Sequence, residues 1–202
     1  MQIPGLLLFD LGGVLIDWDG ILPLLELTEG RISAEQARRF WLESEYVRMF
    51  ECGRCTPAEF ASGVIRELEL DLEPERFIEA FIGWDRGPLP GVGELLESLR
   101  GRIPMACLSN NNPLHWTRKR FNRGWNRYFE YQFISYEIGL VKPDREIFEY
   151  VLSHVPFHSA EIAYFDDNPE CVEVAKQCGM AAFQATGVEE LRSILWRFDL
   201  PV

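Results

Sequence analysis

Short apolar runs, separated by polar and helical segments, place the strongest constraint on how this chain can fold. Five such runs occupy residues 6–10, 104–110, 131–135, 162–167 and 181–185. They are continuously apolar and do not alternate, which is typical of strands that are covered on both faces of a sheet. From residue 91 onward they alternate with segments of helical periodicity. The pattern therefore predicts an α/β fold with a doubly wound parallel sheet.

The long stretch between the first two runs interrupts this alternation, because it contains no convincing strand and several capped helices. Capping boxes begin two of those helices, at Ser33 with Gln36 and at Thr56 with Glu59. Linker-like segments flank the stretch at residues 16–20 and 84–91. We predict a small all-helical cap at residues 17–87, inserted after the first strand into a core formed by residues 1–16 and 88–202.

The charge balance argues against polyanionic partners. The chain has 202 residues, with 20 Lys and Arg against 32 Asp and Glu, and a net charge of −12. This charge opposes nonspecific binding to nucleic acid and to anionic membrane surfaces. We interpret the basic stretch at residues 118–127 as a solvated helix face.

The sequence also indicates the compartment. It contains no apolar run of about 20 residues that could span a membrane, and its N-terminus lacks the features of a signal peptide. The five cysteines are an odd number, which is not typical of a secreted disulfide framework. We expect a cytoplasmic protein with reduced thiols, without a nucleic-acid or membrane partner.

Polar residues close several of the apolar runs, and these positions are the candidate site. They are Asp10, Ser109 with Asn110, and Asp166 with Asp167. Taken singly, each could be a turn or a helix cap. In an open parallel sheet, however, ligands bind outside the carboxyl ends of the strands, where these residues would meet. Three carboxylates at one edge raise each other's pKa unless a cation is present, and Mg²⁺ prefers such oxygen ligands.

Lys142 precedes a predicted helix, with Pro143 as the expected first helical residue. A cation is disfavoured at the positive end of a helix dipole, so an anion bound nearby would compensate. A metal, a lysine and a hydroxyl around one pocket are typical of a phosphate site. A carboxylate there can act as a nucleophile and form an aspartyl-phosphate by in-line attack.

Four segments in order resemble the motifs of the haloacid dehalogenase (HAD) superfamily: "FDLGGVL", "LSNNN", "GLVKPDREIF" and "YFDDNPECVEVAKQCGM". The resemblance covers the chain outside the insertion and implies a Rossmann-like core with a helical C1-type cap. It implies that Asp10 is the nucleophile and that Ser109 and Asn110 bind the phosphate. Lys142 would be the cation that holds the nucleophile and the phosphate together. It further implies that Mg²⁺ is bound by Asp10, the backbone carbonyl of Gly12 and Asp167. Asp166 would act through a water molecule or by contacting the direct ligands.

Within the superfamily the chain is most similar to bacterial sugar-phosphate phosphatases related to α-glucose-1-phosphate phosphatase. This predicts a Mg²⁺-dependent phosphatase of a small phosphorylated metabolite, with a sugar phosphate as the expected substrate. Phosphatases of the superfamily usually carry a second Asp two residues after the nucleophile, where this chain has Gly12. Loss of that general acid typically costs ~10²- to 10⁴-fold in rate, which favours substrates with good leaving groups. Asp17 or Asp19 could substitute, although a solvated start of the cap is the preferred interpretation.

Two alternatives remain open. A 2-haloacid dehalogenase also lacks the second Asp, but it needs no metal, and the pair Asp166 and Asp167 argues against it. A phosphate-binding or interaction protein with low turnover is compatible with Gly12. The cap residues Trp18, Trp41, Met49 and Phe50 could line the pocket, but packing within the cap is the preferred interpretation. The sequence indicates neither the substrate nor the oligomeric state.

Overall fold

The computed structural model describes residues 2–116, 127–200 and 202. Its centre is a five-stranded sheet with the order β5-β4-β1-β6-β7, in which every neighbouring pair is parallel. The strands are β1 (Leu6–Phe9), β4 (Met105–Ser109), β5 (Tyr131–Ile134), β6 (Ile162–Asp166) and β7 (Ala181–Gln184). The predicted doubly wound parallel sheet is therefore confirmed, with each strand inside one of the five apolar runs.

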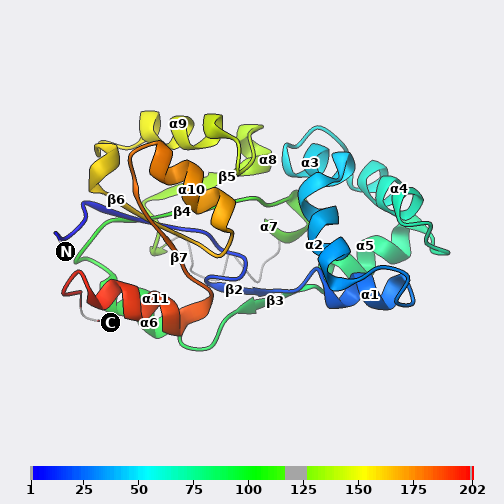
Figure 1. Ribbon diagram of the computed structural model, residues 1–202, viewed down its shortest axis with the longest axis horizontal. Coiled ribbons are helices and arrows are strands. Elements are labelled where there is room, and N and C mark those ends of the chain that lie inside the picture. Colours follow the sequence, from blue (N-terminus) through cyan, green and yellow to red (C-terminus); the bar gives the residue numbers. More distant parts are fainter. Residues whose placement is uncertain (1, 117–126, 201) are drawn as a thin grey trace.

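Helices cover both faces of this sheet (Figure 1). Helices α9 (Arg145–His154) and α10 (Pro169–Gln177) lie on one face, and α6 (Val92–Leu99) and α11 (Gly187–Trp196) lie on the other. Successive residues of β1 point to opposite faces, so Leu6 and Leu8 join one apolar cluster while Leu7 and Phe9 join the other. Both faces of the strand are buried, and this explains why the run is continuously apolar.

Five helices form a separate lobe at one end of the molecule (Figure 1). They are α1 (Leu22–Leu27), α2 (Ala34–Glu43), α3 (Glu45–Glu51), α4 (Pro57–Glu67) and α5 (Pro74–Ile82). Both predicted capping boxes are present, at the starts of α2 and α4. The lobe has its own apolar core, in which the rings of Phe50 and Phe60 stack 4.3 Å apart. The division of the chain at residues 17 and 87 stays a prediction.

The sequence predicts linkers without strands between the sheet and the helical lobe. The structure instead has a strand in each of the two connections. Strands β2 (Ile16–Trp18) and β3 (Asp85–Pro88) pair antiparallel, with Ile16 opposite Pro88 and Trp18 opposite Asp85. The prediction is wrong here because such short strands show no period. Their pairing joins distant segments, and Gly87 and Pro88 are residue types typical of turns.

A second difference concerns the segment around Lys142. Helix α9 begins at Arg145 with Asp144 as its N-cap, and the peptide bond between Lys142 and Pro143 is cis. Pro143 is therefore not the first helical residue, and Lys142 lies outside the first turn of the helix. The helix-dipole argument for an anion at Lys142 is wrong in this detail, and the case for an anion has to come from side-chain geometry.

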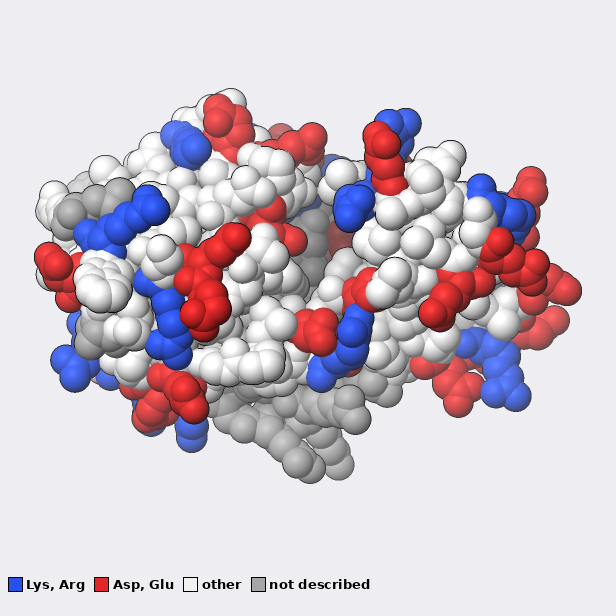
Figure 2. All heavy atoms as spheres, turned by 60° about the horizontal axis from the view of Figure 1, so that its bottom comes forward, with Lys and Arg blue, Asp and Glu red and all other residues white. Residues whose placement is uncertain are grey.

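Three short helical segments complete the described fold: α7 (Pro113–Trp116), α8 (Ser135–Ile138) and the 3-10 helix η2 (Ser159–Glu161). The basic stretch 118–127 lies outside the described residues except for Arg127. Among the described helices, none combines the length and the apolar character needed to cross a bilayer. On the face shown in Figure 2, Lys and Arg side chains are interspersed with Asp and Glu on both lobes.

Candidate active site

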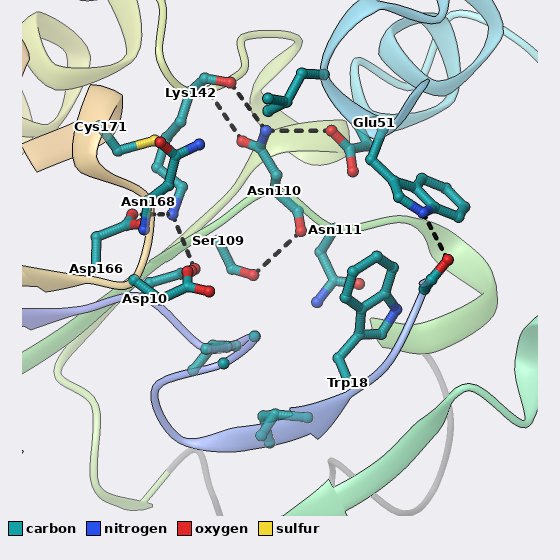
Figure 3. Close-up of a pocket in the computed structure, with 18 of the residues that line it drawn as sticks. Asp10, Trp18, Glu51, Ser109, Asn110, Asn111, Lys142, Asp166, Asn168 and Cys171 are labelled. Carbon is teal, nitrogen blue, oxygen red and sulfur yellow. Dashed lines mark hydrogen bonds and ion pairs between the residues drawn. The ribbon is translucent and has the colours of Figure 1, made fainter. Parts of the chain in front are cut away.

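Asp10 follows β1 directly, and its surroundings are supplied by the ends of neighbouring strands. Its carboxylate Oδ1 lies 2.8 Å from Lys142 Nζ, and the same ammonium lies 2.6 Å from Asp166 Oδ2 at the end of β6. The Lys142 side chain is 4% exposed and that of Asp166 is 1% exposed. The structure thus places a buried cation between two carboxylates that the sequence separates by more than half its length (Figure 3).

The carboxylates of Asp10, Asp166 and Asp167 offer oxygen atoms that all lie within 4.8 Å of one another. Burial raises the pKa of Asp10 to about 8; Lys142 opposes the rise, and the charges of Asp166 and Asp167 add to it. Burial and then the charge of Asp166 also raise the pKa of Asp167. Burial lowers the pKa of Lys142, but Asp10 and Asp166 outweigh it and hold the pKa well above its usual value. The cluster would be stabilised by further positive charge.

This donor set fits a hard divalent cation. Asp166 is already engaged, because its Oδ2 accepts hydrogen bonds from Lys142 and from the Tyr164 hydroxyl, and its Oδ1 accepts one from the Asn168 amide at 2.8 Å. Asp10 and Asp167 therefore have the carboxylates better placed to ligate a metal. Gly13 adopts a φ of +72°, and a Cβ there would lie 2.5 Å from Asp167 Oδ2. Glycine thus lets the loop after β1 approach the carboxylate closely.

Ser109 ends β4 and Asn110 follows it, so both lie at the same edge of the sheet as Asp10. Ser109 is buried, and its hydroxyl donates only one long hydrogen bond, 3.3 Å, to the Asn110 carbonyl. The Asn110 side chain instead binds the Lys142 backbone at both ends: Nδ2 donates to the Lys142 carbonyl at 3.0 Å, and Oδ1 accepts from the Lys142 amide at 2.8 Å. Asn110 therefore holds Lys142 in place, while the Ser109 hydroxyl has capacity for a ligand.

These groups line one side of a cavity of about 600 Å³. We call this side the floor, formed by Asp10, Ser109, Lys142, Asp166 and Asp167. The opposite side, which we call the cap wall, is formed by Trp18, Ile21, Trp41, Leu42, Glu51 and Phe81. The floor is charged and lies at the carboxyl ends of the strands, whereas the cap wall is mostly apolar, with Glu51 as its carboxylate. The exposed Arg38 of α2 also lines the cavity on this side.

The tryptophans of the cap wall both pack and line the cavity. The Trp18 and Trp41 rings meet edge to face with centroids 5.3 Å apart, and Trp41 Nε1 donates to the Gly20 carbonyl at 2.8 Å. Phe50 is 1% exposed in the apolar core of the lobe, as packing predicts. The preference for packing alone is therefore wrong for Trp18 and Trp41. The spacing of aromatic residues along the sequence cannot tell a buried ring from one that faces a cavity, and Trp18 lies in strand β2, not in a helix.

Glu51 is the site residue that sequence reasoning missed. It ends α3, and its Oε2 accepts a hydrogen bond of 3.1 Å from Asn110 Nδ2 on the opposite side of the cavity. Burial raises the pKa of Glu51 to about 7, although the Lys142 charge and the Asn110 hydrogen bond lower it. Nothing in the local sequence distinguishes this Glu from a solvated helix end, because its environment is supplied by residues about sixty positions away.

Asp17 and Asp19 are held by other groups. The Asp19 carboxylate accepts hydrogen bonds from the backbone amides of Ile21 at 2.9 Å and Leu22 at 3.1 Å, and it pairs with Arg86 at 2.6 Å. Asp17 lies 3.7 Å from the same guanidinium and does not line the cavity. Neither carboxylate is directed at the floor.

Gly12, which stands where the second Asp is expected, has free space around its Cα atom. A Cβ built at Gly12 would contact only Trp18 Cβ, at 3.9 Å, which is an ordinary van der Waals distance. Packing therefore does not explain why this position carries glycine. A Cβ atom at this position meets no close contact.

Comparisons with known proteins identify the family of the chain. Residues 5–179 match the model of the haloacid dehalogenase-like hydrolases. D-ribitol-5-phosphate phosphatase from Bacteroides thetaiotaomicron is 23% identical, over 97% of this chain and 96% of that protein. Sesquiterpene phosphatase from Aspergillus oryzae is 28% identical, over 89% of this chain and 88% of that protein.

A solved structure shows the same fold. It is a HAD family enzyme from Bacteroides thetaiotaomicron in complex with magnesium and inorganic phosphate, with a TM-score of 0.76 and 27% identity, covering 95% of this chain and 98% of that one. The family match spans residues 5–179, which is most of the chain. The chain belongs to the haloacid dehalogenase-like hydrolase family.

Proposed function

We propose that this hydrolase is a Mg²⁺-dependent phosphatase of a small phosphorylated metabolite, with a sugar or polyol phosphate as the expected substrate. The observation that carries the proposal is the buried contact of Asp10 with Lys142 at 2.8 Å, beside Asp166 and Asp167 on the cavity floor. A phosphatase of D-ribitol 5-phosphate and a relative holding magnesium and phosphate support it.

In the proposed reaction, Asp10 attacks phosphorus in line with the leaving oxygen and forms an aspartyl-phosphate. Lys142 binds both the Asp10 carboxylate and a phosphate oxygen, and the buried Ser109 hydroxyl donates a hydrogen bond to another. Asn110 orients Lys142 through its two backbone hydrogen bonds. Water then attacks the aspartyl-phosphate and returns Asp10 as a carboxylate.

Asp10, Asp167 and the backbone carbonyl of Gly12 are the proposed ligands of Mg²⁺, with Asp166 acting through water and through Lys142. Bound magnesium supplies positive charge, which favours the ionised nucleophile and neutralises the phosphoryl oxygens. The raised pKa values of Asp10 and Asp167 support this assignment, because a cation would relieve the repulsion that contributes to them.

Gly12 supports a second candidate, a phosphate-binding protein of low turnover, since this position carries no general acid. The two candidates differ in the release of inorganic phosphate from sugar phosphates, polyol phosphates and p-nitrophenyl phosphate, with Mg²⁺ and after its removal by EDTA. A phosphatase releases phosphate only with Mg²⁺, and Asp10→Asn lowers kcat on the order of 10⁵-fold, the scale of losing a covalent nucleophile.

Phosphate binding without release by the wild-type protein would favour the second candidate. Halide release from a 2-haloacid that persists in EDTA would favour a dehalogenase and exclude the proposed metal role. Phosphate release that survives in Asp10→Asn would show that another group is the nucleophile.

A further inference from the structure

Rapid hydrolysis of a phosphate monoester with an alkoxide leaving group needs a group that gives a proton to the leaving oxygen and later takes one from water. Seven carboxylates line the cavity among the described residues: Asp10, Asp19, Glu51, Asp85, Asp166, Asp167 and Glu170. Three of them form the metal and nucleophile cluster of the floor. Asp19 is held by two backbone amides and Arg86, and Asp85 accepts from the Gly87 amide at 2.8 Å. Glu170 is exposed in the first turn of α10.

Among these carboxylates, Glu51 remains as the candidate for proton transfer, and its position in the cavity suits that role. In the view of Figure 3, Ser109 and Asn110 lie between Asp10 and Glu51, so the nucleophile and Glu51 approach the phosphate subsite from different sides. An in-line displacement needs this separation, because the leaving oxygen departs on the side opposite the nucleophile. One oxygen of Glu51 accepts a hydrogen bond from Asn110 at 3.1 Å, which fixes the carboxyl group beside the phosphate-binding residues.

The end of α3 is held against the sheet domain by contacts on either side of Glu51. Arg48 pairs with Asp144, and Arg54 Nη2 donates to the Gly139 carbonyl at 3.3 Å. Gly53 has a φ of +67°, and a Cβ there would lie 2.4 Å from the Tyr136 carbonyl oxygen. The turn after Glu51 can therefore approach the core only because it is glycine. Glu51 thus has a defined position relative to the floor.

We propose that Glu51 is the proton donor and acceptor of the phosphatase reaction, supplying from the cap the function that Gly12 cannot supply. The inference rests on the proposed phosphatase function. In the first step the P–O bond to the leaving group breaks, its electron pair stays on the leaving oxygen, and that oxygen takes the Glu51 proton. In the second step Glu51 carboxylate takes a proton from the attacking water as the bond between phosphorus and Asp10 breaks.

The charges that face Glu51 are compatible with both roles. Burial raises its pKa to about 7, while Lys142 from the floor and Arg48 from its own helix lower it. Both protonation states are therefore accessible near neutral pH, which is the condition for a group that acts first as acid and then as base. A phosphate dianion bound at the floor would raise this pKa further and favour the protonated form needed first.

The test compares Glu51→Gln with the wild type on an alkyl phosphate and on p-nitrophenyl phosphate, both with Mg²⁺. An alkoxide needs the proton and p-nitrophenolate does not. For Glu51→Gln we expect kcat on the alkyl phosphate to fall by ~10²- to 10⁴-fold with little change in KM. With p-nitrophenyl phosphate we expect a rapid burst of p-nitrophenol stoichiometric with enzyme, followed by slow turnover as the aspartyl-phosphate accumulates.

Glu45→Gln is the matched control, since it removes the same charge from an exposed position of the same helix. It should behave as the wild type. In the Glu51→Gln background, Gly12→Asp should restore alkyl phosphate turnover, because it returns a carboxyl group two residues after Asp10, at a position where a Cβ meets no close contact. Restoration would also show that the Glu51→Gln protein is folded and competent.

Equal losses of the first step with both substrates, or no loss with either, would overturn the proposal. A change confined to KM would make Glu51 a specificity residue, which also contradicts it. Failure of the phosphatase function itself is recognised separately: the wild type then releases no phosphate, or Asp10→Asn retains the p-nitrophenol burst.

Discussion

The floor and the cap wall face the same cavity but are built in different ways. The floor consists of charged groups at strand ends, and its Lys142, Asp10 and Asp166 satisfy one another at 2.6–2.8 Å. The cap wall consists of aromatic and aliphatic side chains with Glu51 as its carboxylate, and it reaches the floor through Asn110. The difference suggests that the floor performs phosphoryl chemistry, which requires fixed charge, while the cap wall contacts the variable part of the substrate.

The first prediction concerns the charge balance of the floor. Lys142→Met leaves Asp10 and Asp166 buried without their cation, so we expect the free energy of unfolding to fall by about 3–5 kcal/mol. The loss should be larger at pH 8 than at pH 5, because burial raises the pKa of Asp10 and Lys142 limits the rise to about 8. The variant keeps the Asp10 proton to higher pH, so that only the wild type gains from ionisation of the carboxyl group as the pH rises toward 8. Urea denaturation at the two pH values measures both effects.

Lys176→Met is the control, since Lys176 is exposed on α10. It should change the free energy of unfolding by no more than about 0.5 kcal/mol. If the two variants were equally stable, the floor would not depend on its internal ion pairs, and its contrast with the cap wall would disappear.

The second prediction concerns Glu51, the carboxylate of the cap wall. Its pKa is about 7 in the folded protein against an ordinary value of 4.5, so the folded state binds more protons than the unfolded state between these values. This contribution to stability is complete below about pH 4.5 and is lost as the pH rises through 7. Relative to Glu51→Gln, the wild type should lose up to about 3 kcal/mol in its free energy of unfolding between pH 5 and pH 8.

Urea denaturation of both proteins across this pH range, without metal or substrate, gives the difference directly. A constant difference would mean that Glu51 ionises as a solvated carboxylate. The cap wall would then have no group tuned by its contact with the floor.

The third prediction concerns the turn that brings the cap to the floor. Gly53 and Gly30 have similar positive φ values, +67° and +73°, but a Cβ at Gly30 meets nothing within 4 Å. Gly30→Ala should therefore show backbone strain alone, about 1 kcal/mol. Gly53→Ala should lose roughly 1–3 kcal/mol more, because Cβ must displace the Tyr136 carbonyl. Thermal or urea unfolding of the pair measures the difference.

Only Gly53→Ala should also change the kinetics, because it displaces Glu51 from Asn110. Equal effects of the two substitutions on stability would show that the turn can move away from the core at little cost. The cap wall would then lack a defined position relative to the floor.

The floor could be predicted from the sequence because its information is local. A strand buried on both faces has a continuous apolar run, and the rule that ligands meet strand carboxyl ends then selects Asp10, Ser109 and Asp166 without a structure. The structure brings these residues together with Lys142. Their assigned roles in catalysis and metal binding are still proposals.

The cap wall could not be predicted in the same way. Trp18 and Trp41 have the spacing of packed residues, and only the fold shows that one side of each ring faces a cavity. Glu51 acquires its raised pKa from burial against residues distant in sequence. The β2–β3 pairing is likewise absent from any local pattern, because three- and four-residue strands are too short to show a period.

The β2–β3 pairing affects how the two lobes can move relative to each other. The two segments that connect the lobes, β2 and β3, form one hydrogen-bonded antiparallel pair. Arg86 of β3 adds ion pairs to Asp17 and Asp19. Sliding one strand past the other would break the hydrogen bonds of this ladder. A movement of the helical lobe that keeps the ladder intact would therefore carry both strands together and could not displace the lobe along the strand direction.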